Sequence, residues 1–339
     1  MIKEAISDVV EGKDLSRKEA KEVFDEIMQG KATDAQIAAL LVALRMKGET
    51  SDEISGAAES MKAVVAKVEP GIKEKLLDVV GTGGDQKGTI NVSTAAAIVA
   101  AGAGCVVAKH GNRSVSSRSG AADVLQQLGV KIELTNVQNA RLIENIGIAF
   151  LFAPMHHPAM KYAIGPRKEI GVRTIFNIVG PITNPANAKT CLLGTYSGEL
   201  AEKIANTFVA IGIEKALVVH GDDGCDEISL CSPTTVFEVG KGKVKKYKIR
   251  PEEFGFKRCK EKDVCVADVV ESASDIRKIF EGKLEGPKRD IIALNAGAAI
   301  YANRKAKSIK EGIKMAEKSI DSKAALEKLE MLIKESNRI

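Results

Sequence analysis

Four short segments combine residue types that could bind anions or a metal ion. The first, Gly81 to Asp85, places three glycines and an aspartate directly after the apolar run Leu76–Val80. Glycines let a backbone approach a ligand closely and turn its amides towards an anion. A helix beginning near Asn91 or Ser93 would add free amides and the positive end of its dipole. This segment predicts a cradle for phosphate or pyrophosphate; the alternative is a glycine turn before a capped helix.

The second segment, residues 109–120, combines basic side chains with four serines and an asparagine. It follows an apolar run and precedes a helical pattern, so it occupies the end of a strand. So many cationic and hydroxyl donors favour a second anion site over a solvated connection.

The third segment contains four carboxylates within six positions, Asp222, Asp223, Asp226 and Glu227. Their mutual repulsion is unfavourable unless cations or solvent relieve it. Mg²⁺ is usually bound by one or two carboxylates together with water and substrate phosphates. We expect Asp226 and Glu227 to bind a metal and the other two to form the turn; the alternative is an acidic exposed turn.

The fourth segment contains Arg167 and Arg173 in a pattern that predicts one helical stretch, ended by Gly180-Pro181. An arginine in this place could bind a carboxylate through two parallel hydrogen bonds, although a helix arginine alone is usually a surface residue. His156 and His157 precede a proline and lack metal-ligand spacing, which favours a structural role.

The elements that must position these segments alternate along the chain. Short apolar runs predict strands, and helical patterns lie between them. This alternation predicts an α/β fold with a mostly parallel sheet, in which ligands bind at the carboxyl ends of the strands. The predicted strands are 76–80, 105–111, 148–154, 191–197 and 215–221, and the predicted helices are 94–104, 121–129, 136–147 and 198–212.

The first seventy residues predict helices instead. Capping boxes begin at Ser16, Thr33 and Thr50, and Gly30 and Gly48 fall where helices should end. The helix over 34–48 has more apolar surface than one amphipathic face needs, which indicates either contact with a partner or a central place in a small domain.

Towards the end of the chain, residues 234–249 predict a hairpin at the sheet edge. The basic run 241–250 alternates as an exposed strand does, which is favoured over a nucleic-acid patch. Helices close the chain.

Composition limits the function classes. The 339 residues are 45% hydrophobic and 28% charged, enough for one large or two modest globular domains. The apolar runs are of strand length and the N-terminus lacks a signal-peptide core, so we expect a cytoplasmic protein without membrane contact. The net charge of +5 suits a polyanionic small molecule as well as DNA. Six cysteines without a CxxC spacing predict reduced thiols and no zinc site.

Five blocks, taken in order, resemble the anthranilate phosphoribosyltransferase family over nearly the whole chain. They are GTGGD (81–85), NVSTAAA (91–97), KHGNRSVSS (109–117), the run from 156 to 186, and DEISL (226–230). The resemblance implies transfer of the phosphoribosyl group of 5-phosphoribosyl 1-diphosphate (PRPP) to the amine of anthranilate, with release of pyrophosphate, in tryptophan biosynthesis. It also implies two Mg²⁺ ions per monomer and a homodimer formed through the helical domain, with no nucleic-acid partner.

The implied fold is of the nucleoside phosphorylase type, with the active site between two domains. A helical domain would comprise residues 1–70 and a middle segment of about 158–182. An α/β domain would comprise 71–157 and 183–339.

The resemblance also implies a role for particular residues. Two loops would bind PRPP, and the acceptor and metal sites would lie beside them. The PRPP residues are Gly81, Gly84, Asp85, Thr89, Asn91, Val92, Ser93, Thr94, Lys109, His110, Gly111, Asn112, Arg113, Ser114, Val115, Ser116, Ser117 and Ala121; the anthranilate residues are Gly81, Asn112, His157 and Arg167; the metal ligands are Ser93, Asp226 and Glu227.

Two positions depart from the family pattern. Ala121 stands where many members have serine, and Ile90 where many have phenylalanine. Loss of the serine hydroxyl should weaken one PRPP contact by about 0.5–1.5 kcal/mol. We expect no essential side-chain acid or base, because the aromatic amine of anthranilate is already neutral at physiological pH.

Two other functions would fit this fold. A pyrimidine nucleoside phosphorylase would use phosphate and a nucleoside, and the blocks at 109–117 and 226–230 argue against it. A nucleic-acid-binding paralogue should have lost the metal carboxylates or the acceptor arginine, whereas this chain has Asp226, Glu227 and Arg167.

Overall fold

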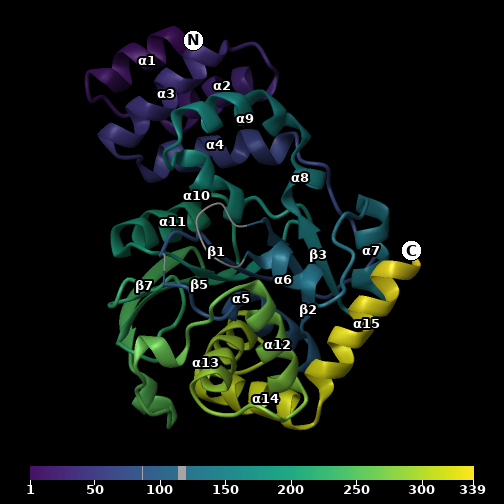
Figure 1. Ribbon diagram of the computed structural model, residues 1–339. Helices are drawn as coiled ribbons and strands as arrows, with labels where there is room; N and C mark the ends of the chain where they lie inside the picture. The colour runs from purple at the N-terminus through teal and green to yellow at the C-terminus, as the bar shows by residue number, and fades with distance from the viewer. Residues whose placement is uncertain (86, 114–119) are drawn as a thin grey trace.

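The computed structural model describes residues 1–85, 87–113 and 120–339. A small helical lobe, which contains the N-terminus, lies above a larger lobe built on a β-sheet (Figure 1). The C-terminal helix runs along the outside of the larger lobe. In the described ranges, no helix is long and apolar enough to cross a membrane.

One sheet of seven strands, in the part of the chain described, forms the frame of the larger lobe, in the order β3-β2-β1-β4-β5-β6-β7. The first five strands are parallel, and β6 and β7 add an antiparallel hairpin at one edge. The mostly parallel sheet expected from the sequence is therefore confirmed. The strands are β1 (Leu76–Gly81), β2 (Val106–Gly111), β3 (Ile148–Phe152), β4 (Thr190–Gly194), β5 (Lys215–Gly221), β6 (Thr234–Gly240) and β7 (Lys243–Ile249).

Alternate residues of the central strands enter two different cores, because successive side chains of a strand point to opposite faces. On one face, Val79 and Leu217 pack into a core shared with the helices that cover that face. On the other, Val80 and Val218 join a core that extends into the helical lobe. The first face is covered by α5 (Val92–Gly102), α6 (Ala121–Gln127), α7 (Asn136–Ile146), α12 (Val269–Phe280), α13 (Pro287–Ala302), α14 (Ile309–Asp321) and α15 (Ala324–Arg338), and the second by α11 (Gly198–Ala210).

The helical lobe combines the first four helices with two from the middle of the chain. Phe24 of α2 packs edge-on against Phe176 of α10, with ring centroids 5.6 Å apart. Figure 1 shows α9 lying across the N-terminal helices, although three strands separate them in sequence. The helices of this lobe are α1 (Ile2–Val10), α2 (Arg17–Met28), α3 (Asp34–Lys47), α4 (Ser51–Ala63), α9 (Lys161–Ile170) and α10 (Ile175–Ile182).

The three capping boxes predicted in this lobe are confirmed. Ser16, Thr33 and Thr50 each accept a hydrogen bond from the backbone N–H three residues later. Helix α3 buries Ile37, Leu40, Leu41, Ala43 and Leu44, while Met46 is 82% exposed.

Short helical turns join the lobes and complete the larger one. They are α8 (Ala153–His156), η1 (Pro158–Met160), η2 (Pro251–Phe254) and η3 (Glu261–Asp263). The basic run lies in β7, an edge strand whose lysines are mostly exposed, as the alternation predicted.

The single helical stretch predicted around Arg167 and Arg173 is wrong. Helix α9 ends at Gly171, which adopts a left-handed conformation (φ 63°) and so turns the chain. Arg173 lies in the connection between two helices, and Gly180-Pro181 lies inside the last turn of α10 instead of ending a longer helix.

Candidate active site

A cavity of about 500 Å³ opens where the carboxyl ends of β1 and β2 face α9 and α10. Both lobes contribute to its wall, so residues far apart in sequence meet there. The site residues predicted from the sequence that line it are Gly81, Gly84, Asp85, Thr89, Asn91, Val92, Ser93, Lys109, His110, Gly111, Asn112, Arg113, Ala121, His157, Arg167, Asp226 and Glu227. Ser114, Val115, Ser116 and Ser117 lie outside the described residues.

The glycine-rich loop leaves β1 at Gly81 and forms one wall. The N–H of Thr82 donates to the carbonyl of Gly194 at 2.9 Å, which holds the start of the loop against β4. A side chain at Gly81 would crowd the metal-binding candidates, since its Cβ would lie 3.1 Å from Oδ2 of Asp226. Further along the loop, the N–H of Ile90 donates to the carbonyl of Val264 at 2.9 Å, which fixes the residues around Thr89.

Helix α5 directs its first turn at the cavity. The amides of Val92, Ser93 and Thr94 have no partner within the helix, because they belong to its first turn. Thr94 is the exception among the predicted residues: its side chain is fully buried and does not line the cavity. Only its backbone amide can serve the site, because its position in the helix turns the side chain inwards.

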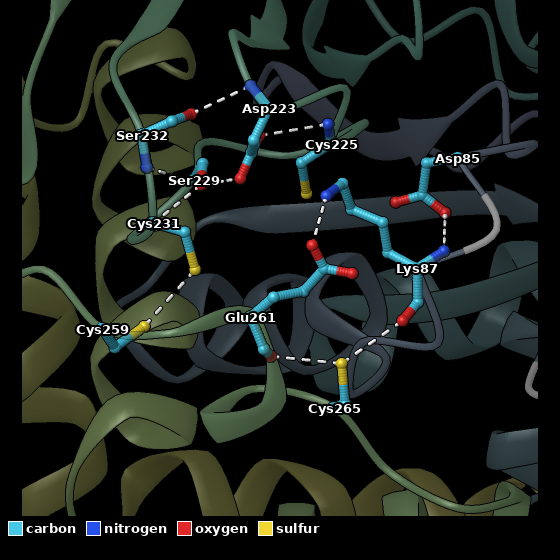
Figure 2. A network of polar contacts seen from close by, with 10 residues as sticks. All are labelled: Asp85, Lys87, Asp223, Cys225, Ser229, Cys231, Ser232, Cys259, Glu261 and Cys265. Atoms are coloured by element: carbon cyan, nitrogen blue, oxygen red, sulfur yellow. Dashed lines mark hydrogen bonds and ion pairs between the residues drawn. The ribbon is translucent and has the colours of Figure 1, made fainter.

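The acidic segment after β5 is a turn that presents two of its four carboxylates to the cavity. Asp222 pairs with Lys248 at 2.7 Å. Figure 2 shows Asp223, which accepts from the hydroxyl of Ser229 at 2.8 Å and from the N–H of Cys225 at 3.2 Å. These contacts build the turn, as the sequence predicted for Asp222 and Asp223.

The two remaining carboxylates are held close to the sheet. The carbonyl of Asp226 packs so closely on Gly194 that a Cβ there would lie 1.5 Å from it. Glu227 is only 8% exposed. Its carboxylate is stabilised by the backbone N–H of Ser93, which brings the three predicted metal ligands together.

Burial raises the pKa values of both Asp226 and Glu227, and the neighbouring carboxylate of Asp85 raises that of Asp226 further. In the ranges described, neither residue forms an ion pair within 4 Å, and no three His, Cys, Asp or Glu side chains form a complete metal site. Crowded oxygen donors that form no close ion pair in these ranges fit Mg²⁺, which is bound by few carboxylates and completes its shell with water and phosphate.

Lys109 supplies positive charge beneath these carboxylates. Its side chain is 3% exposed, and its ammonium donates to the carbonyl of Val79 at 2.5 Å and to the hydroxyl of Ser93 at 3.3 Å. Burial lowers its pKa, while Asp78 and Glu227 oppose that shift. Lys109 therefore fixes the position of a predicted metal ligand.

Two histidines close the inner end of the cavity. Nε2 of His157 lies 3.2 Å from Nε2 of His110, so one imidazole donates and the other accepts. Burial lowers the pKa of His157 to about 4 and holds that of His110 well below its ordinary value. Both rings are therefore neutral near pH 7.

Arg167 reaches the cavity from α9. Its guanidinium lies over the ring of Phe176, 5.5 Å from the centroid, and burial lowers its pKa. Across the described residues its side chain forms no ion pair or hydrogen bond, unlike Arg113, which pairs with Asp123 at 2.9 Å. A partly buried guanidinium without a protein partner is suited to a carboxylate ligand.

The chain was compared with known proteins. Residues 3–64 match the helical bundle domain of a glycosyl transferase family, and residues 73–326 match the a/b domain of a glycosyl transferase family. Anthranilate phosphoribosyltransferase from Acetivibrio thermocellus is 50% identical over 337 residues, covering 99% of this chain and 97% of that protein. The chain belongs to the anthranilate phosphoribosyltransferase family.

Solved structures agree with this assignment. Anthranilate phosphoribosyltransferase from Thermus thermophilus matches with a TM-score of 0.92 and 41% identity, over 98% of this chain and 99% of that one. The Saccharomyces cerevisiae enzyme in complex with PRPP and Mg matches with a TM-score of 0.90 and 29% identity, over 100% and 98%. The fold, the family and the enzyme class expected from the sequence motifs are confirmed.

Arg173 was noted beside Arg167 in the sequence but was not among the predicted site residues. It also lines the cavity, and its guanidinium lies against the glycine-rich loop. The sequence contained one signal for it, the glycine at position 171, which separates Arg173 from the helix that carries Arg167.

Proposed function

We propose that this cavity transfers the phosphoribosyl group of PRPP to the amine of anthranilate, with Mg²⁺, giving N-(5-phosphoribosyl)anthranilate and pyrophosphate. This is the reaction of the family, in tryptophan biosynthesis. One observation carries the assignment of the cavity: Arg167, which has no ion pair or hydrogen bond among the described residues, lines the same cavity as a glycine-rich loop, a helix N-terminus and two buried carboxylates.

The diphosphate of PRPP binds between the glycine-rich loop and the start of α5. The amides of Val92 and Thr94, which have no partner within the helix, and the helix dipole favour an anion at that point. The end of β2, with Asn112 and Arg113, continues this wall. The Saccharomyces cerevisiae relative was solved in complex with PRPP and Mg, which supports the choice of these ligands.

Ser93, Asp226 and Glu227 hold the metal, with two ions per monomer. When bound, Mg²⁺ neutralises the negative charge that develops on departing pyrophosphate. The protein prepares this step by crowding carboxylates in a buried place, so that a divalent cation relieves their repulsion.

Anthranilate binds on the opposite side, with its carboxylate on Arg167 and its ring near Gly81, Asn112 and His157. The Saccharomyces cerevisiae structure in complex with 4-fluoroanthranilate matches this chain with a TM-score of 0.89 and 27% identity, over 100% of this chain and 98% of that one. The neutral pair His110 and His157 can donate and accept a hydrogen bond, but their lowered pKa values make them weak bases. The reaction therefore relies on orientation and charge neutralisation.

The two domains that meet at the cavity are residues 1–70 with 158–182, and residues 71–157 with 183–339. The helical domain also forms the interface of a homodimer. Two large apolar side chains on neighbouring helices support this part of the proposal, Val10 at the end of α1 and Met46 on α3, which are 70% and 82% exposed. The cytoplasmic location expected from the sequence stays a prediction.

The test is the loss of anthranilate fluorescence when the protein is mixed with PRPP and Mg²⁺, with an EDTA control. Glu227→Gln should reduce turnover at least 100-fold and raise the Mg²⁺ requirement, because it removes a ligand charge. Asp222→Asn is the matched control: it lies in the same turn, pairs with Lys248 and should keep nearly full activity. Turnover in EDTA, or equal loss in the two variants, would contradict the proposal.

A further inference from the structure

Arg173 belongs to the helical lobe but makes its contacts on the other side of the cavity. It lies between α9 (Lys161–Ile170) and α10 (Ile175–Ile182), where the turn at Gly171 frees its side chain from a helix surface. Its guanidinium donates to the carbonyl of Thr82 at 2.9 Å. Thr82 is the second residue of the glycine-rich loop, so this hydrogen bond joins the two lobes.

Two further contacts fix the guanidinium in place. It stacks over the ring of Tyr196, 4.8 Å from the centroid, just beyond the end of β4. On its other side the loop approaches closely: a Cβ at Gly84 would lie 2.1 Å from Nη1 of Arg173. A side chain at this position would push the guanidinium aside, and the positive φ of 98° also favours glycine.

Near its tip the loop is held within its own lobe by Asp226, whose carboxylate accepts from the N–H of Gly83 and is hydrogen-bonded to the side chain of Asp85. Gly83 and Gly84 both have positive φ angles and carry no side chain that could pack against the cavity wall. The N–H of Thr82 is held by β4, and Asp85 accepts from the N–H of Lys87 at 3.2 Å within the loop itself. Among the described residues, Arg173 is the side chain of the opposite lobe that hydrogen-bonds to this loop.

We propose that Arg173 is a positioning residue for diphosphate binding. It acts through the glycine-rich loop: the stack on Tyr196 orients the guanidinium, the hydrogen bond to Thr82 fixes the loop, and the loop amides then converge on the anion. The inference rests on the proposed function of the loop as the PRPP site. It gives the two arginines of this segment different tasks, Arg167 for the acceptor and Arg173 for the donor.

The experiment compares Arg173→Gln with Arg167→Gln in steady-state kinetics with Mg²⁺. Arg173→Gln should raise the KM for PRPP at least tenfold and leave the KM for anthranilate within twofold. Arg167→Gln should show the opposite pattern. Arg173→Lys should recover part of the PRPP affinity, because an ammonium can donate to the Thr82 carbonyl but cannot stack as a plane on Tyr196.

A double-mutant cycle tests the route through Tyr196. Tyr196→Leu should weaken PRPP binding several-fold in the unmodified protein and have no further effect in Arg173→Gln, because the two side chains act as one unit. Thermal melting of each variant shows that it is folded. If Arg173→Gln fails to fold, Arg173→Lys and Tyr196→Leu carry the same comparison.

Binding of pyrophosphate with Mg²⁺, measured by calorimetry, separates this inference from the proposed reaction. Weaker pyrophosphate binding in Arg173→Gln than in Arg167→Gln would support the positioning role even if anthranilate were not the acceptor. An unchanged KM for PRPP in folded Arg173→Gln, equal rises in both KM values, or additive effects in the cycle would overturn it. No turnover by the unmodified protein would instead refute the proposed function.

Discussion

Replacing Arg167 by methionine should separate substrate binding from stability. In most proteins, removing one partner of a buried charge pair leaves the other charge unpaired and destabilises the fold. Arg167 has no such partner among the described residues, and its guanidinium lies over the ring of Phe176, 5.5 Å from the centroid. The variant therefore deletes a cation that burial already disfavours, as its lowered pKa indicates.

The magnitudes follow from these contacts. Hydrogen bonds to a charged group contribute about 1.5–3 kcal/mol, so losing the anthranilate carboxylate contact should raise the KM for anthranilate roughly 10- to 150-fold. The lost contact with Phe176 costs about 0.5–1 kcal/mol, and removing a partly buried charge offsets it. The free energy of unfolding should therefore stay within about 1 kcal/mol of the original value.

The assay combines anthranilate fluorescence kinetics at saturating PRPP with urea unfolding of the ligand-free protein. Lys168→Met is the matched control, since Lys168 is the next residue of α9 and is exposed. It should change neither quantity. A fall of more than about 2 kcal/mol in the free energy of unfolding, with an unchanged KM for anthranilate, would refute the reasoning. It would show that Arg167 stabilises the fold and does not bind the substrate.

Three further perturbations test other parts of the structure. Glu53 is fully buried, accepts from the N–H groups of Leu15 and Thr50 and pairs with Lys47. Glu53→Ala should therefore lower the free energy of unfolding, measured in urea, by about 3–5 kcal/mol. The control Asp52→Ala, at an exposed position, should lower it by less than about 1 kcal/mol. Gly194→Ala should destabilise the protein and weaken Mg²⁺-dependent turnover, because its Cβ would overlap the Asp226 carbonyl; normal melting and magnesium titration curves would disprove this. Burial lowers the pKa of His157 to about 4 in the folded protein, below its ordinary 6.5, so as the pH falls the unfolded chain binds this proton first. The contribution of His157 to the free energy of unfolding should therefore be complete above pH 6.5 and fall by about 3 kcal/mol towards pH 4. His157→Gln should reduce this pH dependence in urea unfolding.

Much of the framework could be predicted because its causes are local. The capping boxes at Ser16, Thr33 and Thr50 depend on residues three positions apart, and strands buried on both faces leave continuous apolar runs. The site segments followed from one topological rule, that ligands bind at the carboxyl ends of parallel strands. The sequence predicted different roles for the four carboxylates, because some of them were expected to form the turn, as Asp222 and Asp223 do, which left Asp226 and Glu227 as the metal-binding candidates.

The remaining features depend on contacts between distant segments. The inward direction of the Thr94 side chain is set by the packing of α5 on the sheet, which periodicity in an alanine-rich helix does not reveal. Arg173 was placed in a helix because the glycine at 171 was not recognised as a stop. Its contact with Thr82, 91 residues away in sequence, exists only once both lobes have formed.

The insertion of α9 and α10 into the helical lobe sets the order in which a ribosome can complete this protein. Helix α4 ends at Ala63, but Phe176, which packs against Phe24, is made about 110 residues later. At typical synthesis rates of roughly 5–20 residues per second, that interval is on the order of 5–20 seconds. During this time the N-terminal helices lack part of their core, while β1, β2 and β3 are already emerging. The N-terminal lobe, although synthesised first, is therefore finished only after the sheet has begun to assemble, and the nascent chain carries an open apolar face that a chaperone can bind.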